Sequence, residues 1–127
     1  MNFYDLIKQQ NLGSLLLSGN FGLEKENVRT DLAGNIALTP HPEAFGDKAK
    51  HPYITTDFAE SQVEMVTPIF DTTKEALNFV EALHDIVSLE LNNEVLWHYS
   101  LPHVLPHDAH LIKAAHSTEP QITESRK

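Results

Sequence analysis

Cysteine is absent from this 127-residue chain, and basic residues are scarce, with 9 Lys and Arg against 18 Asp and Glu. The lack of thiols excludes disulfide bonds, thiolate metal sites and a cysteine nucleophile. The formal net charge of −9 argues against nucleic acid as a partner, because the phosphate backbone is also negative. A protein of this charge suits cationic ligands instead.

Long apolar runs and a phosphate-binding glycine loop are missing as well. Nowhere do 18 apolar residues follow one another, and the first residues have no basic region followed by an apolar stretch. We therefore expect a cytoplasmic protein with no membrane partner. The missing glycine-rich loop excludes a P-loop enzyme on this segment. The length allows one modest domain.

The most unusual stretch that is present is residues 54–68, which holds three carboxylates, Asp57, Glu60 and Glu64, and no basic residue. From Glu60 onward acidic or amide side chains alternate with smaller or apolar ones, which is the two-residue period of a half-buried strand. We interpret the stretch as one acidic strand with Glu60 and Glu64 on the same face.

An earlier stretch, residues 21–29, has the same pattern, because Glu24 and Glu26 are two residues apart and fall on one side of a strand. A tight turn is predicted at residues 33–35 and a return strand at 36–38, so the region reads as an antiparallel hairpin. Two acidic strands therefore look like two walls of one site.

A helix is predicted over residues 73–92. Thr72 and Glu75 have the spacing of a capping box, and the expected inner positions recur at helical intervals. These positions are Leu77, Val80, His84, Val87 and Leu91. We expect a core role for His84. The helix would cover one face of the acidic strands, which gives an α+β fold with an antiparallel sheet and a covering helix.

The rest of the chain is assigned more simply. Asn2 is expected to cap a short amino-terminal packing helix, with Asp5 at its third position. Residues 43–52 are predicted to form a loop, and 96–102 a short extended segment. From residue 103 onward we expect a loop that ends in a polar tail.

Carboxylates gathered on adjacent strands repel one another and are stable mainly when cations compensate them. Oxygen ligands without cysteine favour a hard cation such as Mg²⁺, which is usually held by one or two carboxylates, water and a substrate's phosphates. This predicts a nucleotide-dependent enzyme. The alternative is that the acids form only the solvated face of an antiparallel sheet. A metal site at His107 and His110 is a weaker hypothesis.

Four blocks of sequence resemble, in order and spacing, the amino-terminal part of bacterial glutamate–cysteine ligase. They are Phe-Gly-Leu-Glu-Lys-Glu-Asn-Val-Arg (21–29), Leu-Thr-Pro-His-Pro (38–42), His-Pro-Tyr-Ile-Thr-Thr-Asp-Phe-Ala-Glu-Ser-Gln-Val-Glu (51–64) and Leu-Trp-His-Tyr-Ser-Leu-Pro (96–102). The similarity covers residues 10 to 112. It is closest to the ligase module of bifunctional glutathione synthases.

The resemblance implies a partial glutamine-synthetase-like catalytic domain, in which a curved antiparallel sheet holds Mg²⁺ and ATP. The implied reaction activates the γ-carboxylate of glutamate as an acyl phosphate, which the cysteine amine attacks in the first step of glutathione biosynthesis. Glu24, Glu26 and Glu64 match the family's metal-binding carboxylates. Asp57 matches an acid near the metal and the cysteine pocket, and Glu60 a recurrent acid; both are candidate catalytic residues.

The chain departs from the family in two ways. Residues 97–103 read Trp-His-Tyr-Ser-Leu-Pro-His where the family usually has Trp-Pro-x-Ser-Met-Pro-Pro, which removes two prolines. Family members are also several times longer. We therefore expect residues 1–112 to be the amino-terminal part of the catalytic domain and 113–127 a polar, disordered tail, with little ligase activity in the chain alone. Arg29 is expected to support the carboxylates.

Two other functions stay open on the sequence. One is a non-enzymatic acidic module that binds divalent cations or a partner protein. The other is a different carboxylate–amine ligase, because the residues present do not specify the amine. The sequence indicates no oligomeric state.

Overall fold

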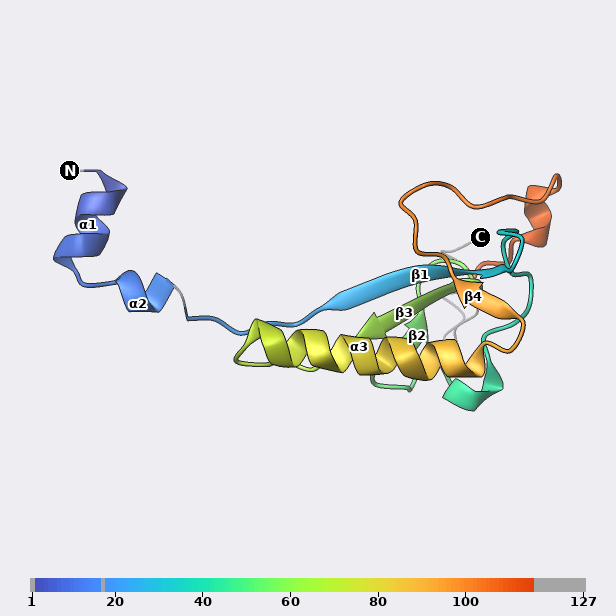
Figure 1. Cartoon of the computed structure of the whole chain (residues 1–127), viewed down its shortest axis with the longest axis horizontal. Coiled ribbons are helices and arrows are strands. Elements are labelled where there is room, and N and C mark those ends of the chain that lie inside the picture. The colour runs from blue at the N-terminus through green and yellow to red at the C-terminus, as the bar shows by residue number, and fades with distance from the viewer. Residues whose placement is uncertain (1, 17, 116–127) are drawn as a thin grey trace.

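The computed structural model describes residues 2–16 and 18–115. Along the chain the elements are α1 (Phe3–Gln9), α2 (Gly13–Leu16), β1 (Glu24–Asp31), the 3-10 turn η1 (Glu43–Phe45), β2 (Ile54–Thr56), β3 (Gln62–Val66), α3 (Thr73–Glu90), β4 (Glu94–Leu96) and the 3-10 turn η2 (Ala109–Leu111). Figure 1 shows α1 and α2 as an arm that stands away from a body built by the other elements. Within the described ranges, the helices are too short or too polar to cross a lipid bilayer.

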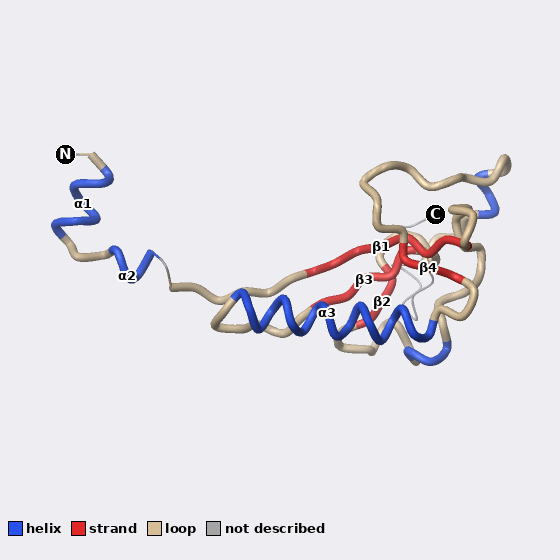
Figure 2. Tube along the Cα trace, in the orientation of Figure 1, coloured by secondary structure: helices blue, strands red, loops and turns tan. Residues whose placement is uncertain are grey.

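The sheet has four strands in the order β2-β3-β1-β4, and every neighbouring pair is antiparallel. β1 lies in the middle because its first half pairs with β3 and its last three residues pair with β4. Figure 2 shows these strands grouped on one side of α3. The predicted α+β fold, with an antiparallel sheet and one covering helix, is confirmed.

The prediction of a single strand over residues 54–68 is wrong. The stretch contains two strands, β2 and β3, which pair with each other and are joined by a turn at residues 57–61. The backbone N–H of Asp57 donates to the carbonyl of Gln62 (3.1 Å), and the N–H of Gln62 donates to Ala59 (2.9 Å). The turn reverses the chain in the middle of the stretch, so regular alternation begins only at Gln62.

The expected turn after β1 is present, but the return strand is reduced to single bridges. Gly34 takes a positive φ of 83°, which glycine adopts without strain. The Asp31 carboxylate accepts the N–H groups of Ala33 (2.8 Å) and Asn35 (2.9 Å) and holds the turn. Beyond it only Ile36 bridges back to β1, because the two prolines that follow in residues 38–42 cannot donate to a ladder.

Helix α3 begins where the sequence predicts, with the hydroxyl of Thr72 accepting the N–H of Glu75 at 3.3 Å. It packs against β3, whose Val63 and Met65 are fully buried. Each such side chain contributes about 1.5–3 kcal/mol to folding. The buried core cluster is Phe45, Ile54, Val63, Met65, Leu83, Val87, Leu91 and Leu96.

The predicted inner face of α3 is confirmed at Val87 and Leu91, which are buried, but it is wrong at Leu77. Ala76 and Leu83 are buried, whereas Leu77, predicted to face inward, is 57 % exposed. Phe79 and Val80 pack at the edge of the core. The buried position in the first turn is therefore Ala76 rather than Leu77.

The amino-terminal helix has the predicted cap, in which Asn2 and Asp5 form a reciprocal capping box. Its expected packing is not seen, because Phe3 and Tyr4 are 72 % and 63 % exposed. At the other end, order continues past the predicted boundary at residue 112. Ala115 is fully buried, and its N–H donates to Phe58 (2.9 Å). The remainder of the predicted tail, 116–127, lies outside the described residues.

Candidate functional site

Three of the predicted acids share the sheet face that points away from α3. In the register of β1 and β3, Glu26 lies directly opposite Glu64. Residues directly opposite or two apart on a strand point to the same side, so Glu24 joins this pair. Val63 and its neighbours of the buried core point the other way, under α3. We call the side that carries Glu24, Glu26 and Glu64 the acid face.

Two further polar residues extend the acid face toward β2. The Gln62 side-chain amide donates to Glu26 Oε2 at 2.8 Å. Asp57 lies one pair beyond the β2–β3 ladder, opposite Gln62, because its N–H donates to the Gln62 carbonyl at 3.1 Å. This pairing places Asp57 on the same side as Glu64. The alternation of residues 60–64 already places Gln62 on the same strand face as Glu64. Its bond to Glu26 could be found only from the register of β1 and β3.

Glu60 lies elsewhere, and the prediction that it shares a strand face with Glu64 is wrong. It belongs to the turn between β2 and β3 and is buried. Its carboxylate accepts the backbone N–H of His41 at 3.0 Å and pairs with the Lys48 ammonium. The geometry gives Glu60 a structural task, which is to hold the 41–48 loop against the turn.

Arg29 supports the loops rather than the carboxylates of the acid face. It is only 1 % exposed, and its guanidinium donates to Glu94 Oε2 (2.6 Å) and to the hydroxyl (2.8 Å) and carbonyl (2.8 Å) of Thr39. A further bond reaches the Glu60 carbonyl at 3.0 Å. Because Arg29 and Glu26 are an odd number of residues apart on β1, they point to opposite faces.

Lys25 points away from the acid face for the same reason. Its ammonium contacts the side-chain carbonyl of Asn27 and lies 3.2 Å from His84 Nδ1 on α3. Burial lowers the pKa of Lys25. Burial, followed by the charges of Lys25 and His98, lowers the pKa of His84. Both basic residues of β1 are therefore on the side of the sheet opposite Glu24 and Glu26.

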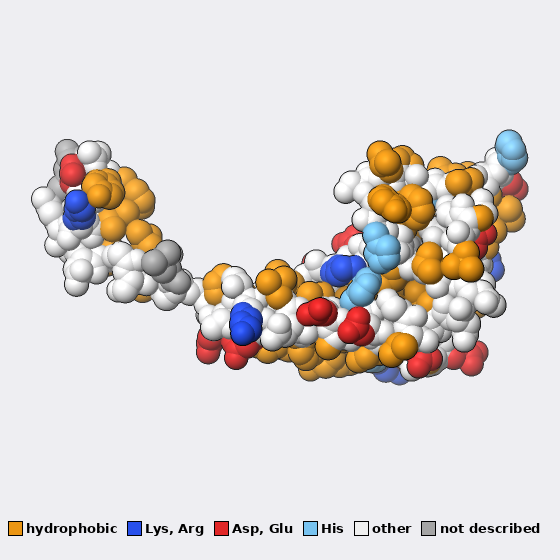
Figure 3. All heavy atoms as spheres, viewed as in Figure 1, with side chains coloured by type: hydrophobic (Ala, Val, Ile, Leu, Met, Phe, Trp, Pro, Cys, Tyr) orange, Lys and Arg blue, Asp and Glu red, His pale blue; other side chains and the backbone are white. Residues whose placement is uncertain are grey.

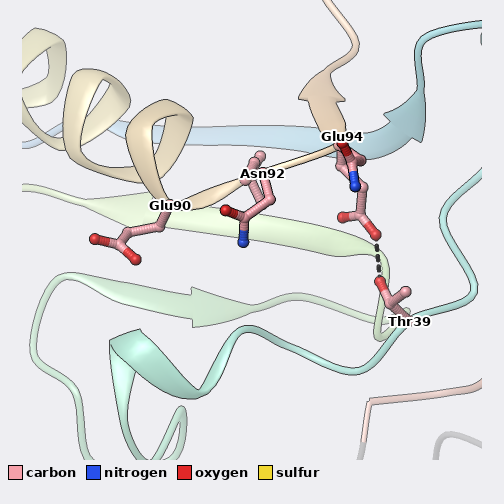
Figure 4. A pocket seen from close by; sticks show the side chains of 6 residues that line it. Thr39, Glu90, Asn92 and Glu94 are labelled. Carbon is pink, nitrogen blue, oxygen red and sulfur yellow. Dashed lines mark hydrogen bonds between the residues drawn. The ribbon is translucent and has the colours of Figure 1, made fainter.

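Two pockets lie near these groups, each of about 270 Å³. One is at the edge of the acid face and is lined by Gly22, Leu23, Glu24, Val66 and Thr67. The other lies past the carboxyl end of α3, where Figure 4 shows Glu90, Asn92 and Glu94 around it, with Glu94 bound to Thr39. Glu24 is thus a predicted site residue that also lines a pocket.

The donor chemistry of the acid face fits a hard divalent cation, since carboxylate oxygens are the ligands that Mg²⁺ prefers. The side chains do not form a complete ligand set. Within residues 2–16 and 18–115, no three His, Asp or Glu side chains come close enough together to hold one ion. The Gln62 amide also donates to one oxygen of Glu26. The assigned roles of Glu24, Glu26, Glu64, Asp57 and Glu60 stay predictions.

Comparisons with known proteins agree on one family. A family model described as glutamate-cysteine ligase matches residues 4–125. A relative from Desulfotalea psychrophila, named glutathione biosynthesis bifunctional protein, is 52 % identical over 101 residues, which are 80 % of this chain and 13 % of the relative.

Two solved structures have the same fold. A bifunctional glutathione synthetase from Pasteurella multocida superposes with a TM-score of 0.87 and 38 % identity, over 95 % of this chain and 16 % of its own. A glutamate–cysteine ligase from Francisella tularensis, solved in complex with AMP, gives a TM-score of 0.64 and 27 % identity, over 76 % of this chain and 19 % of its own. The chain thus spans less than a fifth of each of these proteins.

Proposed function

The chain belongs to the glutamate–cysteine ligase family, and on this basis we propose that it forms the cation-binding wall of an ATP-dependent ligase that joins glutamate to cysteine. The observation that carries the proposal is the acid face, where Glu26 lies directly opposite Glu64 and Glu24 is two residues away on β1. Like charges placed directly opposite on neighbouring strands destabilise a sheet. A cation bound between them removes that cost.

We assign Glu24, Glu26 and Glu64 as the residues that would hold Mg²⁺. When bound with ATP, Mg²⁺ neutralises charge on the phosphates during transfer to a carboxylate. Gln62 orients Glu26 through its amide, and Asp57 adds a carboxylate at the far end of the same face. All of these groups except Asp57 lie on strands, which keep them in a fixed arrangement.

The substrates follow from the family rather than from the residues of this chain. The γ-carboxylate of glutamate would be phosphorylated by ATP, and the amine of cysteine would then displace phosphate to give γ-glutamylcysteine. The AMP held by the Francisella tularensis ligase supports nucleotide use on this fold. Cytoplasmic location remains a prediction, as does the identity of the amine.

We further propose that this chain alone has little ligase activity. The phosphates of ATP need cationic side chains as well as metal ions, and Lys25 and Arg29 of β1 point away from the acid face. In relatives more than four-fifths of the protein lies outside the region matched here. The remaining cationic groups would come from that part.

Calorimetric titration of Mg²⁺, with and without ATP, tests the function. Glu64→Gln and Glu26→Gln should each weaken Mg²⁺ binding about tenfold, the effect of losing one charge-assisted contact. ATP should strengthen binding in the unmodified chain. Glu81→Gln, at an exposed position of α3, is the matched control and should change nothing.

The same titration separates the competing functions. Mg²⁺ binding that ignores ATP, and that survives both acid-face substitutions, would contradict the proposal and favour a non-enzymatic acidic module. A ligase with another amine substrate would keep both the Mg²⁺ and the ATP dependence. It would be recognised by ADP release with amines other than cysteine once the remaining part of the enzyme is supplied.

A further inference from the structure

A second cluster of charged groups lies on the side of the sheet that faces α3. Lys25 of β1, His84 of α3 and His98, which follows β4, come from three separate elements. Lys25 Nζ lies 3.2 Å from His84 Nδ1, and the rings of His84 and His98 are 5.8 Å apart between centroids with a 53° tilt. In Figure 3 blue and pale-blue side chains lie next to one another over the body of the molecule.

The ammonium of Lys25 is not neutralised by a direct ion pair in the described part of the chain. The ion pairs found in the described part of the chain involve Arg29, Lys48 and Lys50, and none of them includes Lys25. The contacts of Lys25 are the Asn27 side-chain carbonyl and the His84 ring. In a chain of net charge −9, Lys25 is thus an ammonium without a direct carboxylate partner in the described residues.

The acids around the cluster are few and exposed. Asp85 follows His84 on α3 and favours its protonation, but it acts more weakly than Lys25 and His98, which oppose protonation. Glu81, one turn earlier on α3, is also exposed to solvent. Carboxylates in water screen a half-buried ammonium poorly, so the cluster retains its attraction for anions.

We propose that Lys25, His84 and His98 bind a phosphate-type oxyanion on the α3 side of the sheet. Three donors from three elements suit a group whose oxygens point in several directions, and a lysine ammonium is a common phosphate ligand. A divalent metal fits less well, because the ammonium of Lys25 faces Nδ1 of His84 and would repel it. The acid face is on the other side of the sheet, so this inference does not depend on the proposed ligase function.

A ligand bound at this cluster would also affect the stability of the fold. A phosphate held there would tie β1, α3 and the segment after β4 together, and would therefore stabilise the chain in proportion to its occupancy. The side chains of Lys25 and His84 are half-buried, whereas the side chain of His98 is exposed to solvent. Access from solvent is thus through the His98 side.

Calorimetric titration of the full chain with inorganic phosphate at low salt and pH 6.5 tests the proposal. Lys25→Met and His98→Gln should each weaken phosphate binding about tenfold, as expected for one charge-assisted hydrogen bond. Lys74→Met, at an exposed position in the first turn of α3, is the matched control and should bind as the unmodified chain does. The His98 variant keeps the test decisive if Lys25→Met impairs folding.

Parallel titrations identify the source of the anion. If ATP competes with phosphate at this cluster, the ligand is the phosphate chain of a nucleotide; if it does not, the ligand is free phosphate, and both results support the site. In NMR spectra, phosphate should shift the ring signals of His84 and His98 but not those of His110 in η2. Unchanged phosphate affinity in both variants would overturn the proposal, as would acetate binding as tightly as phosphate.

Discussion

At the scale of single residues, the cross-strand pair of Glu26 and Glu64 is the feature that most clearly costs folding free energy. Two carboxylates directly opposite on neighbouring strands repel each other, and only the Gln62 amide is seen to bind the Glu26 side chain within the described residues. Sheets of this kind usually place opposite charges or apolar groups there. The arrangement is easier to understand as a cation site than as a stabilising surface.

We predict that Glu26→Gln makes the chain more stable without Mg²⁺, by about 0.5 kcal/mol, the usual size of a cross-strand effect. The same substitution should reduce the rise in melting temperature that Mg²⁺ produces. Thermal unfolding with and without Mg²⁺ measures both changes, with Glu81→Gln as the control. A less stable variant that still responds fully to Mg²⁺ would speak against a cation site.

We expect the folded chain to lose stability at acidic pH because of His41. Both ring nitrogens are buried without a hydrogen-bond partner in the described part of the chain. Burial, followed by the charges of Lys48 and Arg29, lowers the pKa of His41 from 6.5 to about 4. The folded state therefore binds this proton less readily than the unfolded state. The resulting stability is complete above pH 6.5 and is lost as the pH falls from 6.5 toward 4.

We predict that His41→Leu flattens this decline. In the unmodified chain, protonation linked to His41 should lower the free energy of unfolding by up to about 3 kcal/mol between pH 6.5 and 4. Denaturant unfolding at a series of pH values measures it, and the variant should lose less stability over the same interval. Equal slopes for both proteins would show that His41 is not the acid-sensitive group.

At the scale of elements, the network around Arg29 joins parts that the sheet alone leaves separate. Its guanidinium binds Glu94 at the start of β4, Thr39 in the β1–β2 connection and the Glu60 carbonyl in the next turn. This explains why a buried arginine stands in the middle strand. Arg29 thus connects the start of β4 with two loops.

We predict that Arg29→Met destabilises the chain by about 3–5 kcal/mol, the usual cost of removing one partner of a buried ion pair. Lys50→Met is the matched control, since its pair with Asp47 is exposed and should contribute less than about 1 kcal/mol. Urea unfolding followed by circular dichroism provides both values. Similar losses for the two variants would contradict a structural role for the Arg29 network.

Much of this architecture is predictable from sequence, for identifiable reasons. The caps of α1 and α3 are local signals, carried by Asn2 and Thr72. The split of residues 54–68 into two strands depends on tertiary bonds, such as that between Glu60 and Lys48, which no periodicity contains. Alternation still placed Glu24 and Glu26 together, and only the register of β1 and β3 adds Glu64 opposite them.

At the scale of the whole molecule, the body presents the acid face, which we propose is half of a site. Several large apolar side chains are exposed on it and on the arm, including Leu32, Ile69 and Leu89. Further protein packed against these side chains would remove them from water. This agrees with relatives in which the matched region is less than a fifth of the protein.

We predict that the isolated 127 residues show little ADP release with glutamate, cysteine, ATP and Mg²⁺. The reason is that the cationic groups needed to bind ATP phosphates are not on the acid face of β1. A coupled ADP assay measures this, with a full-length relative as the positive control. Turnover by the chain at the rate of the relative would contradict the proposal that this chain holds only half of the ligase site.

We propose that the acid face holds the divalent cation, and Mn²⁺ used in place of Mg²⁺ tests this most directly. A bound paramagnetic ion broadens the NMR signals of nearby residues. We predict broadening at Glu24, Glu26 and Glu64 in the presence of ATP, and its loss in Glu64→Gln. Broadening centred instead on Glu90 and Glu94, beyond the end of α3, would contradict the claim.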